Sequence, residues 1–388
     1  MCVLIAVNQL GFGGIVPSLP LYALSFGVSA SAIGLAVAVY GLARFVIAVP
    51  SGQLADRLGR RPTLTLGGLA SALGNVWCAE ATAYPEFIIA RFLAGAGAGL
   101  ILTTGQVVLA DITTPARRGR TLAIYQGVFI FAVGIGPLPG GLLAEHWGLA
   151  APFWAYGIAS LTASAVAWFA VRETRDLGGT GTARAAGRGP SFATQMRLLS
   201  EQAGFVLVSI IALMNAVART GGLFTIIPVL GRVRLDLTVA EIGAGLALGT
   251  VAGLLVAYPA GMLVDHFGRK AVIVPATVIS GGSLLLFCLA PTYLWFVAAC
   301  VAWGIASSIG GAAPAAYAAD SAPAGMNAAA MSTFRMVGDF GYVAGPIALG
   351  LVADAFGAVP ALVLAAVLLM LVGLSFARLA PESHRNRP

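Results

Sequence analysis

Long apolar runs alternate with short polar or charged segments along the whole chain, and this pattern predicts twelve membrane-spanning helices. A span needs about 20 consecutive apolar residues to cross the hydrocarbon core of a bilayer. Runs of that length are separated here by clusters of charge, glycine and proline. The predicted spans are 2–24, 32–54, 63–82, 85–109, 120–144, 150–171, 204–228, 240–263, 271–290, 294–318, 328–353 and 358–379. The chain is therefore predicted to be an all-α polytopic membrane protein.

The composition supports this class and excludes others. Of the 388 residues, 59% are hydrophobic and 10% are charged, whereas soluble domains carry about 25% charged residues. Such a chain is neither disordered nor a disulfide-rich secreted scaffold. The 50 glycines and 20 prolines suit closely packed, locally kinked membrane helices. The four cysteines lie in apolar stretches without metal-type spacing, so we interpret them as packing residues and expect no metal site.

The basic residues predict the orientation of the chain. Sixteen of the 22 lie in connections on one side or in the tail, whereas only Arg232 and Arg234 lie in connections on the other side. Because basic loops stay in the cytoplasm, we expect a multi-pass protein of the inner (plasma) membrane with both termini cytoplasmic. The formal charge of +7 then reflects membrane topology and not nucleic-acid binding. The first span begins near Met1 without a basic segment, so we expect no cleaved signal peptide.

The chain contains an internal repeat with a constant offset of 209 residues. The segment 50–61 (PSGQLADRLGRR) recurs at 259–270 (PAGMLVDHFGRK). Four further correspondences share the offset: Asp111 with Asp320, Gly136-Pro137 with Gly345-Pro346, Ala144-Glu145 with Ala353-Asp354, and Glu173 with Glu382. We therefore predict two six-helix bundles in parallel repeat. Such halves are the architecture of rocking transporters, which bind substrate at the midplane between them.

The repeat also predicts the domain bounds. The N-terminal bundle spans 1–171, a polar, glycine-rich cytoplasmic linker spans 172–203, the C-terminal bundle spans 204–380, and a cytoplasmic tail spans 381–388. The seventh span starts near Gly204, which the offset places at position −5, before Met1. The first helix is therefore expected to lack about one turn, and Met1 is an uncertain natural start.

Several motifs resemble those of the major facilitator superfamily, and the resemblance covers essentially the whole chain. The segment 52–61 resembles the signature of the loop between the second and third helices, and 261–270 is a weaker second copy. The segment 91–99 (RFLAGAGAG) resembles the arginine motif of the fourth helix. The segment 136–141 (GPLPGG) resembles the fifth-helix motif of drug/proton antiporters, although Ala123 and Ala132 replace two expected glycines. The resemblance implies the twelve-helix major facilitator fold.

The loop motifs suggest a cytoplasmic latch between the halves. Glycine permits tight backbone turns and close approach, and Asp56 can accept hydrogen bonds from Arg60 and stabilise a helix N-terminus. By resemblance, Asp56 faces the start of the eleventh helix, and the second copy faces the fifth. The predicted latch residues are Gly52, Asp56, Gly59, Arg60, Arg61, Asp111, Gly261, Asp265, Gly268, Arg269 and Asp320. The alternative interpretation is a turn with topology-setting charge.

Glycine and proline within the fifth and eleventh spans predict kinks that pack closely against other helices. The kink residues are Gly136, Pro137, Gly140, Gly141, Gly345 and Pro346. A packing kink is one interpretation, and a seal against leak during exchange is another.

Four arginines lie inside predicted spans, where an unpaired charge costs several kcal/mol. Arg335 lies four residues before Asp339, so pairing on one helix face explains both. Arg44, Arg91 and Arg219 have no carboxylate at helical spacing in their own spans. An anionic substrate would explain them, and so would hydrogen bonds to backbone carbonyls.

The remaining polar positions suggest a mostly apolar substrate cavity. The candidate cavity residues are Asn8, Gln9, Arg44, Gln126, Asn215 and Arg219. A few polar groups in an apolar lining suit amphipathic organic molecules better than sugars.

No catalytic constellation is visible, so we expect no enzyme. The single lysine, Lys270, precedes alanine, so the chain has no phosphate-binding loop for ATP. The three histidines lie in loops or the tail, which leaves no membrane histidine for a hydrolase or metal site.

These features predict a secondary active transporter that exports small amphipathic organic compounds in exchange for protons. The alternatives are proton-coupled or facilitated uptake of a small organic anion, and a non-transporting receptor or scaffold on the same fold. We expect no cofactor besides the proton as coupling ion. The expected partners are the substrate and the lipid bilayer, without ATP or nucleic acid, and we expect a monomer.

Elimination identifies the candidates for proton coupling. Of the fifteen acidic residues, only Glu80 and Asp339 lie away from the cytoplasmic and periplasmic ends of the spans. Burial would raise the pKa of Asp339 and Arg335 would lower it, so the carboxyl can switch as the pair opens and closes. A permanently paired structural aspartate is the alternative. The candidate residues for proton coupling are therefore Asp339, Arg335 and Glu80, together with Arg91.

Reporter fusions test the predicted topology. A reporter placed after residue 180 and one at the C-terminus should both be cytoplasmic, and one placed between 232 and 238 should be periplasmic. A periplasmic C-terminus would imply an odd number of spans and would contradict the two-bundle organisation.

Overall fold

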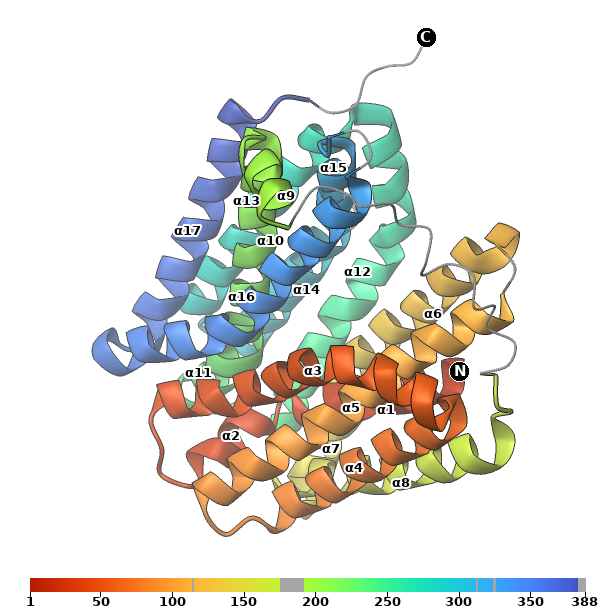
Figure 1. The fold of residues 1–388 in the computed structure, drawn as a ribbon. Helices are drawn as coiled ribbons and strands as arrows, with labels where there is room; N and C mark the ends of the chain where they lie inside the picture. The colour runs from red at the N-terminus through yellow and green to blue at the C-terminus, as the bar shows by residue number, and fades with distance from the viewer. Residues whose placement is uncertain (114, 175–191, 312, 324–325, 383–388) are drawn as a thin grey trace. The chain divides into compact units, whose positions relative to one another are not determined.

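The computed structural model describes residues 1–113, 115–174, 192–311, 313–323 and 326–382, and this part of the chain is helical without β-strands (Figure 1). In the N-terminal part the helices are α1 (Cys2–Ile15), α2 (Leu19–Leu24), α3 (Ala30–Leu58), α4 (Arg60–Glu80), α5 (Tyr84–Ile112), α6 (Pro115–Ile135), α7 (Pro137–Trp147) and α8 (Ala151–Ala170). They are followed by α9 (Phe192–Ser200), α10 (Ala203–Val217), a π-helix (Ala218–Ile226), α11 (Ile227–Leu235), α12 (Val239–Phe267), α13 (Arg269–Leu289), α14 (Tyr293–Ile309), α15 (Ala313–Asp320), α16 (Asn327–Phe356) and α17 (Ala358–Leu379). The predicted all-α class is confirmed.

Each of the twelve predicted spans coincides with a helix or with consecutive helices. The first span is divided between α1 and α2, and the fifth is divided at Gly136 between α6 and α7. Each break lies beside a proline, Pro17 or Pro137, which cannot donate a backbone hydrogen bond. The seventh span continues through the π-helix, where the hydrogen-bond pattern changes without a break.

Ten helical stretches in the described residues are long and apolar enough to cross a membrane. The helices α1 and α4 fall outside this set. The 14 residues of α1 span only about 21 Å. The helix α4 buries polar side chains, among them Thr63, Ser71 and Asn75. The count of twelve spans stays a prediction, whereas the membrane-spanning class does not depend on it.

Residue contacts divide the chain into two compact units. The first comprises Met1–Val28, Leu35–Ala186 and Thr238–Ala247, and the second comprises Ser29–Gly34, Gly187–Leu237 and Leu248–Pro388. The first turn of α3 therefore groups with the second unit, and the first two turns of α12 group with the first. The predicted bundles, 1–171 and 204–380, assign each of these two helix starts to the other unit.

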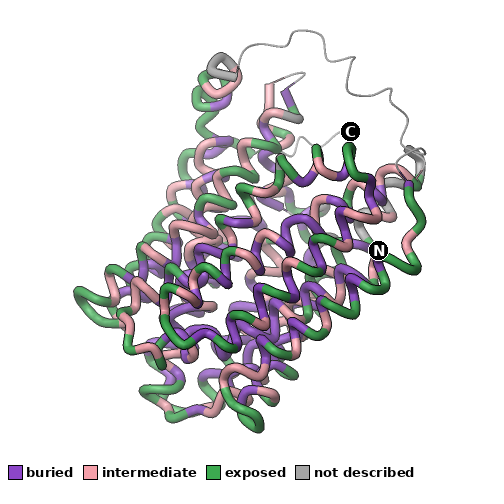
Figure 2. Tube along the Cα trace, turned by 60° about the horizontal axis from the view of Figure 1, so that its bottom comes forward, coloured by how far each residue is buried: buried purple, intermediate pink, exposed green. Residues whose placement is uncertain are grey.

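The core of the first unit is formed where α4 packs against α5 and α8 (Figure 1). Buried and exposed residues alternate along the helices (Figure 2). A Cβ atom on Gly97 would lie within 3.0 Å of the backbone of Gly67 and Ser71, so the backbones of α4 and α5 are in direct contact. The Ser71 hydroxyl lies 3.2 Å from the Ser160 hydroxyl of α8. Small residues thus replace bulky packing in this core, as is typical of membrane helices.

The core of the second unit includes a helix from the segment predicted as a linker. The helix α9 buries Leu199 in an apolar cluster that contains Phe205 and Phe376. Met196 packs against the same cluster one turn earlier. The segment predicted as a linker, 172–203, therefore contains a helix at 192–200 whose apolar residues at helical spacing dock there. Residues 175–191 lie outside the described part of the chain.

Candidate functional site

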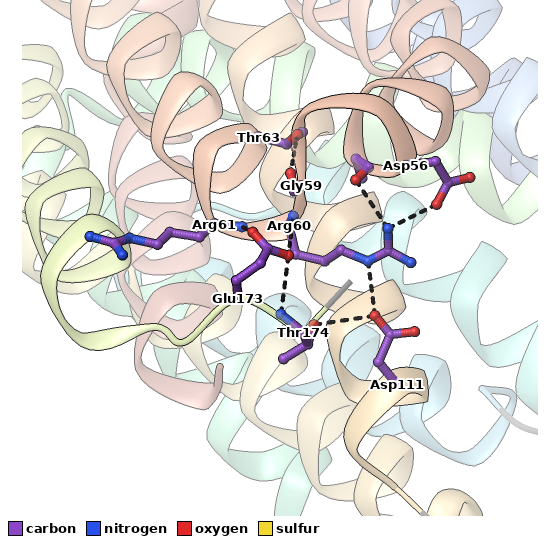
Figure 3. Close-up of polar contacts among 9 residues, drawn as sticks. Asp56, Gly59, Arg60, Arg61, Thr63, Asp111, Glu173 and Thr174 are labelled. Atoms are coloured by element: carbon purple, nitrogen blue, oxygen red, sulfur yellow. Dashed lines mark hydrogen bonds and ion pairs between the residues drawn. The ribbon is translucent and has the colours of Figure 1, made fainter. Parts of the chain in front are cut away.

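A buried arginine lies at the centre of the first loop motif. The guanidinium of Arg60 donates from Nη1 to Asp56 Oδ1 and from Nε to Asp111 Oδ2, each at 2.9 Å (Figure 3). It also donates from Nη1 to the carbonyl oxygen of Ala55 at 3.0 Å. The side chains of Arg60 and Asp111 are 8% and 9% exposed, whereas that of Asp56 is 71% exposed. The predicted hydrogen bond from Arg60 to Asp56 is thus present, and the structure adds Asp111, a predicted latch residue, as the buried partner.

Glu173 and Thr174 complete this cluster, although neither is among the predicted site residues. Glu173 accepts hydrogen bonds from the backbone amides of Arg60 at 2.9 Å and Arg61 at 3.1 Å, which caps the start of α4. Thr174 donates its hydroxyl to Asp111 Oδ2 at 3.2 Å. The signal for Glu173 was its correspondence with Glu382 at the repeat offset. We call Asp56, Arg60, Asp111, Glu173 and Thr174 the Arg60 cluster.

The glycines of the motif behave differently from one another. Gly59 has a φ of 104° and lies against the Glu173 carboxylate, so a side chain there would be strained and would displace the cap. A Cβ atom on Gly52 would meet no atom within 4 Å. The close approach predicted at Gly52 is therefore not found in this structure.

Arg61 does not join the Arg60 cluster through its side chain. Its guanidinium lies over the Trp168 ring at 4.5 Å from the centroid. Figure 3 shows the side chain pointing away from Asp56 and Asp111. Arg61 was predicted in the latch as the last residue of the motif 52–61, but only its backbone amide takes part.

Arg60 remains charged in this environment. Burial alone would lower the pKa of its guanidinium, but the hydrogen bond and charge of Asp111, followed by those of Asp56, raise the pKa above its ordinary value. Three carboxylates and one cation leave the Arg60 cluster with a negative formal charge. The Asp56 side chain is largely exposed. Its predicted neighbour, the start of the eleventh helix, stays a prediction.

The second copy of the motif has a similar but more open arrangement. Arg269 forms an ion pair with Asp320, and these side chains are 22% and 36% exposed. Lys270 donates from its backbone amide to Glu382 at 3.5 Å, and Gly268 has a φ of 88°. The side chains at 261 and 265, which were predicted as latch residues, lie outside the described ones. The second copy thus reproduces the arginine–aspartate pair and the glutamate near the helix start with less burial.

The predicted kink glycines lie in close backbone contacts. A Cβ atom on Gly136 would lie within 3.0 Å of Leu10 and Gly13, and one on Gly140 would clash with the backbone of Gly14. In the second unit, Gly345 lies against the backbone of Val217. The fifth span is therefore packed backbone to backbone against α1, as the glycines predict.

Arg91 is a buried cation in the first unit. It is 1% exposed, donates from Nε to the Ala36 carbonyl oxygen at 3.3 Å, and lies 4.5 Å over the centroid of the Tyr40 ring. The Phe12 ring stacks on the Tyr40 ring, and their centroids are 5.1 Å apart. A carbonyl and an aromatic face thus take the place of a carboxylate around Arg91.

The other predicted cavity residues do not form one buried group. Asn8 and Gln9 are 2% and 1% exposed, and both amide atoms of Asn8 lack a hydrogen-bond partner within the described residues. Gln126 and Arg219 are exposed, and Arg44 and Asn215 are partly buried. A cavity of about 300 Å³ lies in the second unit, but its lining is apolar and contains none of these residues.

The candidate proton carriers are both accessible. Asp339 is 53% exposed and lies 3.8 Å from Arg335, which confirms the predicted pair on one helix face. The predicted burial of Asp339 is wrong, because its face of α16 is not covered. Glu80 accepts a hydrogen bond from the Trp154 indole at 3.2 Å near the end of α4.

Comparisons with known proteins agree on one family. A model of the Major Facilitator Superfamily matches residues 1–244 and 208–388. An uncharacterized MFS-type transporter of Methanocaldococcus jannaschii is 24% identical over 95% of this chain and 94% of its own. The multidrug resistance protein MdtL of a Shewanella species is 22% identical over 70% of this chain and 66% of its own. The fold is similar to that of the nucleoside transporter NupG, with a TM-score of 0.81 and 12% identity over 97% of this chain and 96% of that one.

The Arg60 cluster yields a prediction about stability. Asp111→Asn removes one charge from a buried pair, which typically costs about 3–5 kcal/mol, whereas Asp56→Asn removes an exposed partner worth about 1 kcal/mol or less. Thermal unfolding of the purified protein in detergent should therefore show a clearly larger loss for Asp111→Asn. Asp320→Asn, in the more exposed copy, should lie between them. An equal loss for Asp56→Asn and Asp111→Asn would contradict the central role of the buried pair.

Proposed function

Because the chain belongs to the Major Facilitator Superfamily, a family of membrane transporters and not of enzymes, we propose that it exports small amphipathic organic compounds in exchange for protons by alternating access. The receptor or scaffold alternative does not agree with this family. The proposal places the protein in the plasma membrane as a monomer with cytoplasmic termini. It needs no cofactor, and protons are the coupling ion.

The observation that carries the exchange mechanism is the contact of Gly136 and Gly140 with α1. An exchanger must prevent substrate or protons from leaking through a bundle between turnovers. Helices whose backbones are in contact leave no room for a water path between them. The break beside Pro137 allows the two parts of the fifth span to tilt separately without opening this contact.

Three features support an amphipathic substrate and outward transport. The candidate cavity positions combine few polar groups with apolar helices, which favours organic molecules over sugars. The segment 136–141 resembles the antiporter motif. A relative that aligns with 70% of this chain carries the name multidrug resistance protein.

The accessible pair Arg335–Asp339 supports proton coupling. A carrier must be reached by protons and must change its environment between states. Asp339 meets the first condition, being 53% exposed, and its 3.8 Å separation from Arg335 is longer than a normal hydrogen bond. The permanently paired aspartate remains the alternative to this role.

A second candidate function is uptake of a small organic anion. It is favoured by the buried Arg91, whose Nη1 has no hydrogen-bond partner within the described residues. An anionic group would satisfy this nitrogen and balance its charge.

A transport assay distinguishes the two functions. Cells that lack their own exporters and express the chain should accumulate less of an amphipathic cationic dye, and a protonophore should restore accumulation severalfold. Cells with the empty vector are the control. Uptake of an organic acid that stops with the protonophore would favour the second candidate, and no protonophore effect on either compound would contradict proton coupling.

Asp339→Asn tests the proton carrier. The amide retains the shape and polarity of the carboxyl but cannot bind and release a proton at physiological pH. Substrate binding and substrate–substrate exchange in liposomes should persist, whereas transport driven by a pH gradient should fall at least tenfold. Glu80→Gln is the matched control and should retain transport. Retained pH-driven transport in Asp339→Asn would eliminate this residue and make Glu80 or the Arg91 region the next candidate.

A further inference from the structure

The first turn of α3 is capped by a carboxylate from α16. The backbone amides of Ala30 and Ser31 donate to Asp354 Oδ1 at 2.7 Å and to Asp354 Oδ2 at 3.0 Å. The segment Ser29–Gly34 and Asp354 belong to the same unit, although the rest of α3 belongs to the other. A residue 323 positions away thus supplies a helix cap that normally comes from the helix itself.

The backbones of α3 and α16 touch beside this cap. A Cβ atom on Gly350 would lie 2.6 Å from the Ala30 carbonyl oxygen, and one on Gly34 would clash with the Pro346 carbonyl. The two glycines therefore allow the end of α16 to approach the start of α3 closely enough for the carboxylate of Asp354 to reach both amides.

The repeat offset generates a sister contact between α7 and α12. A Cβ atom on Gly141 would lie 2.6 Å from the Val239 carbonyl oxygen, and one on Gly243 would clash with the Pro137 carbonyl. Each of these residues corresponds to one in the first contact: Gly141 to Gly350, Val239 to Ala30, Gly243 to Gly34 and Pro137 to Pro346. The packing is therefore duplicated between the halves.

The capping is not duplicated. The helix α12 caps itself, because Thr238 donates its amide to Glu241 Oε2 at 2.8 Å and Glu241 donates its amide to Thr238 Oγ1 at 3.2 Å. At the corresponding positions α3 has Ser29 and Ala32. Ser29 Oγ accepts a hydrogen bond from Ala32 at 3.4 Å, but alanine cannot provide the returning carboxylate. Asp354 takes the place of that missing group.

We propose that Asp354 is a releasable cap that ties the start of α3 to the end of α16 and so stabilises the conformation in which these two helices are in contact. Release leaves two helix amides without their carboxylate acceptor, so this contact depends on the charge of Asp354. The sister contact releases no cap, because α12 retains its own. The further expectation that the α3–α16 contact opens and closes during transport rests on the proposed function.

Hydrogen exchange in the full-length purified protein tests the cap. In Asp354→Asn, which removes the charge and leaves one acceptor oxygen for two amides, amides in 28–35 should exchange about fivefold faster, since one amide then loses its cap and a lost cap typically weakens a helix start to this extent. Amides in 237–244 should not change. Glu145→Gln, at the position that corresponds to Asp354, is the matched control and should change neither segment. Unchanged exchange in 28–35, or an equal effect of Glu145→Gln, would overturn the proposal.

A distance measurement separates the tie from the cap. One spin label is attached at Ser25→Cys, five residues before α3 begins, and the other at Phe356→Cys, the last residue of α16. The distance between them reports the separation of the start of α3 from the end of α16. The native cysteines are replaced by alanine: Cys2, Cys78, Cys288 and Cys300. Asp354→Asn should move the population severalfold toward longer distances. Adding Ala32→Glu should restore slow exchange in 28–35, because α3 then caps itself, but it should not restore the short distance.

An unchanged distance distribution in Asp354→Asn would reduce the residue to a local cap and refute the tie. Restoration of the short distance by Ala32→Glu would also refute it. Neither measurement uses a substrate or a proton gradient. A failure of the proposed export function would therefore appear in the transport assays alone and can be distinguished from a failure of this inference.

Discussion

Direct contact between helix backbones is the constraint on which the described structure depends. In a bilayer, apolar side chains gain little by leaving lipid for protein, so packing must come from close approach. Glycine provides it at α4–α5, at α1–α7 and again where α3 meets α16. A methyl group at any of these contacts would lie within 3.0 Å of a neighbouring backbone. The abundance of glycine is thus a requirement of the packing.

Close backbone contact within the spans also leaves the charged side chains mainly at the helix ends. The described spans bury few charged groups, and Arg91 is stabilised by a carbonyl and an aromatic ring. The carboxylates act mainly at helix ends, where unpaired amides need acceptors. Glu173 caps α4, and Asp354 caps α3. These caps come from distant parts of the chain, so they couple helix ends that have no covalent connection nearby.

The two halves have the same backbone contacts at corresponding glycines and prolines, but their polar side chains make different interactions. Arg60 lies in a buried cluster with Asp111, whereas Arg269 pairs with the more exposed Asp320. The helix α12 caps itself, whereas α3 depends on Asp354. Duplication thus preserved the glycine and proline positions that set the packing. The acidic side chains around them differ between the two halves.

The sequence by itself determined the helical class, the positions of the helices and the repeat, because hydropathy and glycine–proline spacing are local properties. It also identified Asp56 as a partner of Arg60, because both lie in one motif, and by resemblance it included Asp111 among the latch residues. Only the tertiary structure decided what depends on packing across more than 100 residues: the caps by Glu173 and Asp354, the exposure of Asp339 and the docking of α9. Burial and capping depend on which helix faces which, and hydropathy does not encode that choice.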